Sequence, residues 1–259
     1  MKTNEIRYVH EEEVHNFKAA REVVPFIIEI LNPKSVVDVG CGIGTWLKVF
    51  EENGIIDVLG IDGNYVDKSL MKIDLNNFID FDLEKLFISD KKFDLAISLE
   101  VAEHLSEASS DVFVKTLTGL SDVVIFSAAI PLQDGQNHIN EQEPQYWIEK
   151  FEKEGYKLLD IIRPFFWNNK SVDWWYRQNI LLFTNKKEFH EKFSSFESYS
   201  GSYIVHPESF YHHYIHKFKY FKNRFETLQN DFEKLQSGKY GFRFYLNLLK
   251  KTVLNKFYS

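Results

Sequence analysis

A glycine-rich loop between two acidic residues is the most specific chemical signal in the chain. Residues 38–44, D-V-G-C-G-I-G, follow an apolar run and precede a stretch of helical character that ends at Gly54. Glycines at such a turn let a ligand lie against bare backbone. The first amides of the following helix attract a negative group such as a carboxylate. Asp62, 18 residues after Gly44, ends a second apolar run, where ribose hydroxyls need an acceptor.

A second cluster, Glu100-Val101-Ala102-Glu103-His104, combines two carboxylates with an imidazole. On a helix, Glu100, Glu103 and His104 share one face, so they can coordinate a hard or borderline divalent cation such as Mg²⁺ together. No fourth ligand is evident from the sequence. The alternative is a wall of the ligand pocket with a helix-capping role. We also take His104 as a candidate catalytic residue.

A third cluster spans residues 134–142, D-G-Q-N-H-I-N-E-Q. It follows the apolar run at residues 123–126, and open α/β sheets bind ligands at this carboxyl edge. His138 is a candidate general base that accepts a proton from an alcohol, and Glu141 is placed to orient it. The alternative is that His138 is a structural hydrogen-bond partner.

The elements that must position these clusters alternate between strand and helix. Helical character covers residues 10–31, with an interruption expected at Pro25, and residues 45–53, 109–119 and 144–154. Short apolar runs predict strands at residues 36–39, 58–61, 72–75, 95–99, 123–126, 156–162 and 180–184. This alternation predicts an α/β fold with a doubly wound, mostly parallel sheet.

The D-x-G-x-G-x-G loop resembles that of class I S-adenosylmethionine-dependent methyltransferases. A nicotinamide cofactor fits less well, because its G-x-G-x-x-G spacing expects glycine where Thr45 stands. The resemblance extends over residues 10–185 and implies a Rossmann-like, seven-stranded sheet whose last strand is antiparallel. It also implies S-adenosylmethionine as cofactor, held by a set of residues that comprises Asp38, Gly40, Gly42, Gly44, Asp62, Asp82, Leu83 and Glu100.

Within that set the resemblance assigns separate parts of the cofactor. Asp38 helps to hold the methionine end, and Asp82 and Leu83 contact the adenine. Residues 93–100 resemble the segment that lines the reaction centre. The E-x-x-E-H pattern is similar to that in the methyltransferases of ubiquinone biosynthesis, where the equivalent residues hold a divalent metal. That likeness implies a metal site at Glu100, Glu103 and His104.

Aromatic residues gather after the fifth expected strand, at Trp147, Trp167 and residues 174–176, and lead into Arg177-Gln178-Asn179. Aromatic faces suit sugar rings, and Arg with amides suits hydroxyls, carboxylates or phosphates. The alternative for each tryptophan is a place in the core. The segments F-S-A-A-I-P, H-I-N-E-Q, Y-W and W-W-Y-R-Q-N resemble methyltransferases associated with bacterial surface-polysaccharide synthesis. That resemblance favours a glycan hydroxyl as methyl acceptor.

Charge and periodicity separate the last 49 residues from the rest. Residues 211–259 carry ten basic and three acidic residues, whereas residues 1–210 carry 21 basic and 35 acidic ones. Spacings of 3 and 4 place the following residues on one a/d seam: Tyr211, Tyr214, Phe218, Phe221, Phe225, Leu228, Phe232 and Leu235. We expect a methyltransferase domain over 1–190, a connector over 191–210 and a helical, coiled-coil tail over 211–259.

The tail has alternative roles. The seam can pair with a second copy in a parallel coiled coil, or fold back on the acidic body. The basic, aromatic segment 240–257 can contact an anionic membrane surface or dock on the catalytic domain. The acidic body argues against nucleic acid as partner. With one cysteine, Cys41, and no signal or membrane-spanning segment in the sequence, we expect a cytoplasmic protein, at most peripheral at the membrane.

Three functions compete at this stage. The leading one is an S-adenosylmethionine-dependent methyltransferase that O-methylates a sugar hydroxyl of a bacterial surface glycan or its precursor. The second is a small-molecule or quinone-like O-methyltransferase that uses a divalent metal. The third is a non-catalytic scaffold that binds the cofactor in a biosynthetic complex. The intact glycine loop and Asp62 argue against this third function.

Overall fold

The computed structural model describes residues 16–194, 204–238, 241 and 246. Contacts within the chain divide it into two units, Met1–Ser209 and Phe210–Ser259. Residues 204–209, which the sequence places in the connector, therefore contact the first unit. The expected basic segment at 240–257 lies almost wholly outside the described residues.

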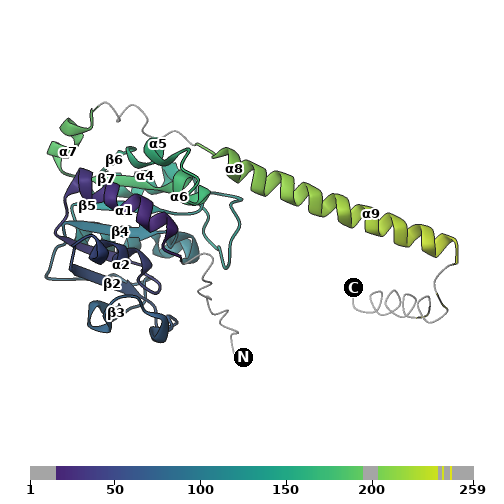
Figure 1. Cartoon of the computed structure of the whole chain (residues 1–259), viewed down its shortest axis with the longest axis horizontal. Helices are drawn as coiled ribbons and strands as arrows, with labels where there is room; N and C mark the ends of the chain where they lie inside the picture. The colour runs from purple at the N-terminus through teal and green to yellow at the C-terminus, as the bar shows by residue number, and fades with distance from the viewer. Residues whose placement is uncertain (1–15, 195–203, 239–240, 242–245, 247–259) are drawn as a thin grey trace. The chain divides into compact units, whose positions relative to one another are not determined.

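The strands of the first unit form one twisted sheet (Figure 1). They are β1 (Ser35–Val39), β2 (Asp57–Asp62), β3 (Phe78–Asp80), β4 (Leu95–Leu99), β5 (Val123–Ser127), β6 (Lys157–Leu159) and β7 (Leu181–Thr184). Their order is β3-β2-β1-β4-β5-β7-β6, and β7 runs antiparallel to both of its neighbours. The Rossmann-like sheet and its antiparallel last strand are confirmed.

Helices cover both faces of this sheet. They are α1 (Lys18–Leu31), α2 (Thr45–Glu52), α3 (Ser110–Leu120), α4 (Pro144–Lys153), α5 (Ile162–Phe166), α6 (Trp174–Asn179) and α7 (Lys187–Lys192). One apolar core joins α1, α2 and α5 to the first face, where Figure 1 shows α1 and α2. A second core joins α3 and α4 to the opposite face, and Phe151 of α4 stacks on Phe183 of β7 there.

Local sequence explains most of these elements. Strands β1, β4 and β5 are buried throughout, which is why they appear in the sequence as unbroken apolar runs. Helix α1 continues through Pro25, whose side of the helix is exposed, and ends at Asn32 in the left-handed conformation. The expected interruption at Pro25 is therefore wrong, because the buried stripe that includes Val23, Val24 and Ile27 holds the helix on the sheet.

Two expected strands differ from the structure. Asp74 accepts a hydrogen bond from the amide of Asn76, at 2.8 Å, and so caps the short helix η2 (Leu75–Asn77). The strand expected at residues 72–75 is therefore wrong, and the third strand begins at Phe78. The strand expected at 156–162 ends at Leu159, because α5 begins at Ile162.

The described part of the second unit is largely one helix. A single turn, α8 (Pro207–Phe210), crosses the boundary between the units and leads into a π-helical turn, η6 (Tyr211–His216). Helix α9 (Lys217–Gln236) follows, and none of its residues is buried. Of the described helices, none combines the length and the apolar character needed to cross a membrane.

Candidate active site

The topology brings the first two clusters to one edge of the sheet. Strand β1 pairs with β2 on one side and with β4 on the other, so the chain order reverses there. Ligands of doubly wound sheets bind at the carboxyl ends of strands beside this reversal. The glycine loop follows β1, Asp62 ends β2, and Glu100 follows β4. The sequence therefore places its acidic candidates at the expected edge.

The glycine loop needs its glycines for conformation and for space. Gly40, Gly42 and Gly44 have φ of 87°, 52° and 80°, in the left-handed region that side chains disfavour. A Cβ at Gly40 would also lie 2.3 Å from a methyl carbon of Val101. The loop after β1 therefore packs directly against the segment after β4, beside Glu100.

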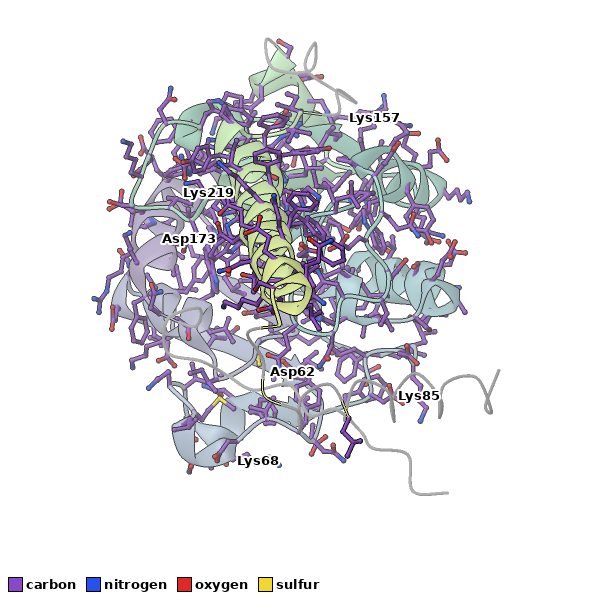
Figure 2. The ribbon with its side chains drawn as sticks, turned by 90° about the vertical axis from the view of Figure 1, so that its right-hand side faces the viewer. Asp62, Lys68, Lys85, Lys157, Asp173 and Lys219 are labelled. Atoms are coloured by element: carbon purple, nitrogen blue, oxygen red, sulfur yellow. The ribbon has the colours of Figure 1, made fainter. Side chains whose placement is uncertain are left out.

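Asp62, which is labelled in Figure 2, fastens the loop to the second strand. Its Oδ2 accepts a hydrogen bond from the amide of Gly42 at 2.6 Å. Its Oδ1 accepts from the amide of Gly63 at 2.6 Å and from the hydroxyl of Tyr65 at 2.5 Å. Sequence reasoning missed Tyr65, although it stands three residues after the acid, in the turn that begins with Gly63.

Asp38 lies buried at the end of β1, close to Asp62. Burial, and then the charge of Asp62, raise the pKa of the Asp38 carboxyl well above its usual range. A cationic group bound here would favour the ionised form of this carboxyl. The position thus suits a ligand that carries an ammonium group.

Asp82 and Leu83, the candidate adenine contacts, follow β3, the neighbour of β2 in the sheet. The amide of Phe81 donates to the carbonyl of Asp62 at 2.8 Å, which holds the segment after β3 beside the end of β2. Leu83 is buried, whereas the side chain of Asp82 is about half exposed. Asp82 accepts from the amide of Glu84 at 3.1 Å and pairs with Lys85 at 3.1 Å.

Glu100 does not lie on a helix with Glu103 and His104, so that expectation is wrong. It stands at a turn after β4 with φ of 56°, because its amide donates to both the carbonyl and the hydroxyl oxygen of Ser127, each at 3.0 Å. Its carboxylate accepts from Gln133 at 2.8 Å and from Asn179 at 3.1 Å. Burial raises the pKa of Glu100, and these hydrogen bonds offset part of that rise.

The candidate metal cluster contains His138 where the sequence predicted Glu100. Glu103, His104 and His138 each offer a ligand atom, and these atoms lie within 4.8 Å of one another. The short helix η3 (Ala102–His104) carries the first two. The loop with His138 is held against η3, because the amides of Ile139 and Asn140 donate to the carbonyl of Glu103.

The charges in this cluster are exposed to little water. Glu103 is fully buried, and neither of its carboxylate oxygens accepts a hydrogen bond of good geometry. Burial and the charge of Glu100 raise the pKa of Glu103 well above its usual range, although the nearby amides of Glu103 and Ala129 offset part of the rise. Burial, and then His138, lower the pKa of His104 to about 4, so its imidazole is neutral near pH 7.

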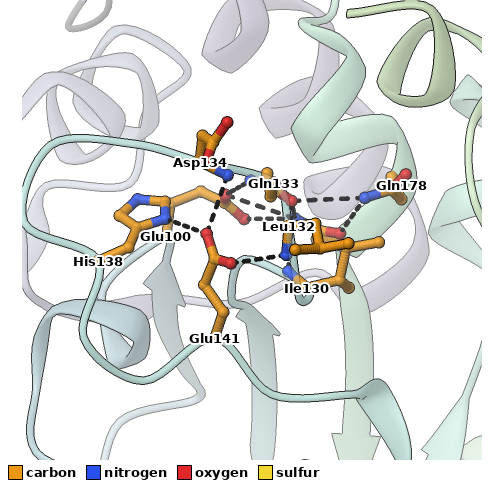
Figure 3. A network of polar contacts seen from close by, with 9 residues as sticks. Glu100, Ile130, Leu132, Gln133, Asp134, His138, Glu141 and Gln178 are labelled. Carbon is orange, nitrogen blue, oxygen red and sulfur yellow. Dashed lines mark hydrogen bonds and ion pairs between the residues drawn. The ribbon is translucent and has the colours of Figure 1, made fainter. Parts of the chain in front are cut away.

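Glu141 organises the loop that carries His138 (Figure 3). Its Oε1 lies 2.8 Å from Nδ1 of His138 and accepts from the amide of Asp134 at 2.9 Å. Its Oε2 accepts from the amide of Leu132 at 2.7 Å. Leu132 and Asp134 both have positive φ, so this carboxylate stabilises a strained loop while it orients the imidazole.

Gly135 makes room for that imidazole, and sequence reasoning missed it. A Cβ at Gly135 would lie 2.1 Å from Nε2 of His138. The glycine in D-G-Q-N-H is therefore required by the ring that packs on it, three residues later.

Comparison with known proteins identifies this arrangement. Residues 11–175 match the model of a family described as a methyltransferase domain. The chain belongs to this methyltransferase family. With the glycine loop and Asp62 in place, it is an S-adenosylmethionine-dependent methyltransferase. No curated protein sequence matches it significantly.

One solved structure agrees with this chain in fold. A magnesium protoporphyrin IX methyltransferase from Synechocystis PCC 6803, crystallised with bound SAH, is 20% identical with a TM-score of 0.50, over 67% of this chain and 84% of that one. DesVI from Streptomyces venezuelae is 10% identical with a TM-score of 0.49, over 69% of this chain and 100% of that one. At these identities the first likeness supports the fold alone.

The residues of this methyltransferase fit its cofactor. S-adenosylmethionine carries an ammonium, a carboxylate and two ribose hydroxyls, and it supplies a methyl group on a sulfonium centre. Asp38 offers a buried carboxyl for the ammonium, and the open backbone of the glycine loop suits the methionine end. Asp62 stands where the ribose is expected, but Tyr65 already donates to it. A ribose hydroxyl that bound this oxygen would have to share it with the Tyr65 hydroxyl or displace that hydroxyl.

The amides and arginine expected to face an acceptor are engaged inside this methyltransferase. Arg177 donates to the carbonyl of Trp167 and pairs with Glu208 at 2.7 Å. Gln178 accepts from the amide of His206 at 2.8 Å. Asn179 binds Glu100, and all three residues of the Arg177–Asn179 run are buried. The prediction that Arg177, Gln178 and Asn179 contact the methyl acceptor directly is therefore wrong.

The tryptophans divide between core and surface. Trp147 is buried in the second core, against Phe126. Trp167 packs on His206, with ring centroids 4.6 Å apart. Trp174 and Trp175 are half-buried and meet edge to face. Trp167 is half-buried as well, so Trp147 is the fully buried tryptophan of the group and the two of α6 are partly exposed.

We predict that Asp62→Asn weakens S-adenosylmethionine binding by roughly 10- to 100-fold, because a neutral amide loses hydrogen bonds to a charged acceptor worth about 1.5–3 kcal/mol. Isothermal titration calorimetry of the full chain measures this. Asp57→Asn is the matched control, since Asp57 is exposed at the opposite end of β2. Equal affinity of the Asp62 variant and the parent would contradict the assignment.

Proposed function

We propose that this enzyme transfers the methyl group to a sugar hydroxyl of a bacterial surface glycan or its precursor. The observation that carries the proposal is the imidazole of His138, fixed by Glu141 at the carboxyl edge of the sheet. A hydroxyl near neutral pH needs a base to take its proton during methylation. An imidazole oriented by a carboxylate is suited to this task.

The residues divide the reaction between them. His138 accepts the hydroxyl proton at Nε2, because Nδ1 faces Glu141. The acceptor oxygen forms its bond to the methyl carbon as the bond from that carbon to sulfur breaks. Glu141 holds the imidazole and stabilises the charge that it gains. The protein otherwise supplies alignment of the two reactants and exclusion of water.

A carbohydrate acceptor draws on two further observations. Trp174 and Trp175 are partly exposed, and aromatic rings suit the apolar faces of a sugar. The segments that resemble polysaccharide methyltransferases include the loop with His138 and the helix with these tryptophans. This resemblance supports a glycan over a small aromatic acceptor.

The glycan is tested in cells of the native host. We expect surface glycan from cells without this protein to lack one methyl group per modified sugar, as measured by mass spectrometry. Cells that express Asp62→Asn instead of the parent provide a matched comparison, and we expect them to lack the same methyl group. Identical glycan masses with and without the protein would contradict a glycan acceptor.

The role of His138 is tested separately from the acceptor. Radiolabelled methyl transfer to a glycan extract should fall by roughly 10²- to 10⁴-fold in His138→Ala, the usual contribution of a general base. Affinity for S-adenosylmethionine should stay within twofold of the parent. His190→Ala is the control, because its imidazole contacts the carbonyl of Thr184 near α7. Unchanged turnover of the His138 variant would remove it as the base.

A second candidate function is supported by Glu103. We propose, as the alternative, O-methylation of a small quinone-like molecule with a divalent metal held by Glu103, His104 and His138. The two buried oxygens of Glu103 accept no hydrogen bond of good geometry, and a cation would supply a strong partner for them. Such an ion lowers the pKa of a bound hydroxyl, so it would replace His138 as the means of activation.

Metal dependence separates the two candidates. If the enzyme uses a divalent metal, the full chain should bind Mn²⁺ in calorimetry. His104→Ala should then weaken that binding by at least about tenfold. His212→Ala is the control, since this histidine is exposed in the second unit. Chelation should then abolish methyl transfer, and added Mg²⁺ or Mn²⁺ should restore it. Full activity after chelation would dismiss the metal and favour His138 as base.

A further inference from the structure

Helix α9 presents an apolar stripe that no described residue of its own unit buries. Its stripe comprises Phe218, Phe221, Phe225, Leu228 and Phe232, with exposed fractions between 59% and 67%. The spacings 3, 4, 3 and 4 place all five on one face. The half-buried Leu235 continues this face at the next spacing of 3, and we call the face from Phe218 to Leu235 the α9 seam. Exposed apolar surface of this size marks an interaction site.

The helix is also difficult to explain without a partner. None of its 20 residues is buried. Helices in proteins gain most of their stability from packing an apolar face against a partner rather than from intrinsic helix propensity. With about 150–250 Å² per aromatic side chain, two copies of the seam bring on the order of 1,000 Å² of surface, the lower bound of a stable interface.

The seam begins later than the sequence suggests. Tyr211 and Tyr214 fit the heptad spacing, but they lie in the π-helical turn η6. A π-helical turn takes more residues than an α-helical one, so it shifts the phase of the side chains before α9. The continuous seam therefore starts at Phe218 and ends with Leu235, and it is centred in the middle of α9, between Glu226 and Thr227.

Charges beside the seam distinguish the two possible pairings of a second copy. In a parallel pair, heptad geometry places Lys217 opposite Lys222 of the second copy, twice, which is repulsive. In an antiparallel pair with Phe225 opposite Leu228 of the second copy, Arg224 faces Asp231 of the second copy. The two-fold axis repeats this attraction. Shifting that antiparallel register by a heptad in either direction brings like charges together, Arg224 with Arg224 or Asp231 with Asp231.

We propose that α9 pairs with α9 of a second copy of this chain in an antiparallel coiled coil centred between residues 226 and 227. Apolar burial supplies the attraction, and the Arg224–Asp231 pairs select orientation and register. Within one copy, Arg224 donates to the hydroxyl of Tyr220 and Asp231 lies 4.0 Å from Lys234, both at exposed positions. Contacts of this kind are weak enough to rearrange on pairing.

Sedimentation of the full chain tests association. The parent should be a dimer at micromolar concentration. Phe225→Asp with Leu228→Asp should sediment as a monomer, because four carboxylates would be buried at the centre of the seam. Asn223→Asp with Asn230→Asp adds the same charge on the opposite face of α9, and this control should remain a dimer. Calorimetry with S-adenosylmethionine should give parental affinity for both, which shows that the first unit is folded.

Charge reversal and crosslinking test orientation. Arg224→Glu or Asp231→Arg alone should raise the dissociation constant about tenfold, and the double variant should restore it. In a parallel pair neither residue faces a charge, so no change would occur. Phe218→Cys should form no disulfide with itself, whereas an equimolar mixture of Phe218→Cys and Leu235→Cys chains should crosslink. Cys41, the native cysteine, is buried.

Each contrary outcome overturns a defined part of the proposal. A parent that is monomeric at all concentrations overturns pairing. Flotation of such a monomer with phosphatidylglycerol vesicles, lost in the Phe225 and Leu228 double variant, would assign the seam to a membrane surface instead. A disulfide between two Phe218→Cys chains would overturn the antiparallel arrangement.

Discussion

The burial of three carboxyl groups at one edge of the sheet is the constraint around which the site is built. Asp38 stands at the end of β1, and the half-buried Glu100 and fully buried Glu103 follow β4, where the chain order reverses. Removing a carboxylate from water costs several kcal/mol unless hydrogen bonds or cations compensate it. Burial is the first cause of the raised pKa of each of the three.

The protein compensates these carboxyls unequally, and the differences indicate what each is for. Glu100 accepts hydrogen bonds from Gln133 and Asn179, so its charge is stabilised within the protein and it fastens β4 to α6. Glu103 accepts no hydrogen bond of comparable geometry. The negative charge of Asp62 disfavours ionisation of Asp38. Such destabilised carboxyls are typical of sites where a bound ligand stabilises their charge. The ammonium of the methyl donor would stabilise the Asp38 carboxylate, and a metal cation would stabilise the Glu103 carboxylate.

The sequence predicted those parts of the fold and site that depend on local pattern. Buried strands such as β1, β4 and β5 appear as apolar runs, and the glycine loop appears as glycines because each needs a left-handed backbone. Failures came from interactions that local pattern does not contain. Asp74 capped a short helix where a strand was expected. Ser127, from the neighbouring strand, held Glu100 in a left-handed turn and removed it from the helical face assumed for E-x-x-E-H.

Long-range contacts account for the remaining differences in the site. His138 lies 34 residues after His104, yet their rings are 4.9 Å apart, because the loop after β5 binds the carbonyl of Glu103. The sequence offered both histidines as candidates without indicating that they meet. In the same way, the sequence suggested Arg177 as a contact of the methyl acceptor. Its ion pair with Glu208, which the sequence does not reveal, indicates a structural role instead. Residue type alone does not distinguish a buried tether from a binding group.

The tail shows the same limit in a periodic pattern. A heptad pattern is read from residue spacing alone, and it assumes that each residue turns the helix by the same angle about its axis. The π-helical turn η6 breaks that constancy, so Tyr211 and Tyr214 match the spacing without sharing the face of Phe218. Losing these two positions changes the symmetry of the seam. A seam from 211 to 235 has its centre at residue 223, where a two-fold axis would set Arg224 against Arg224 and Lys222 against Lys222 of the second copy. The shorter seam has its centre in the middle of α9, where Arg224 meets Asp231. The π-helical turn thus decides which charges face each other across the pair.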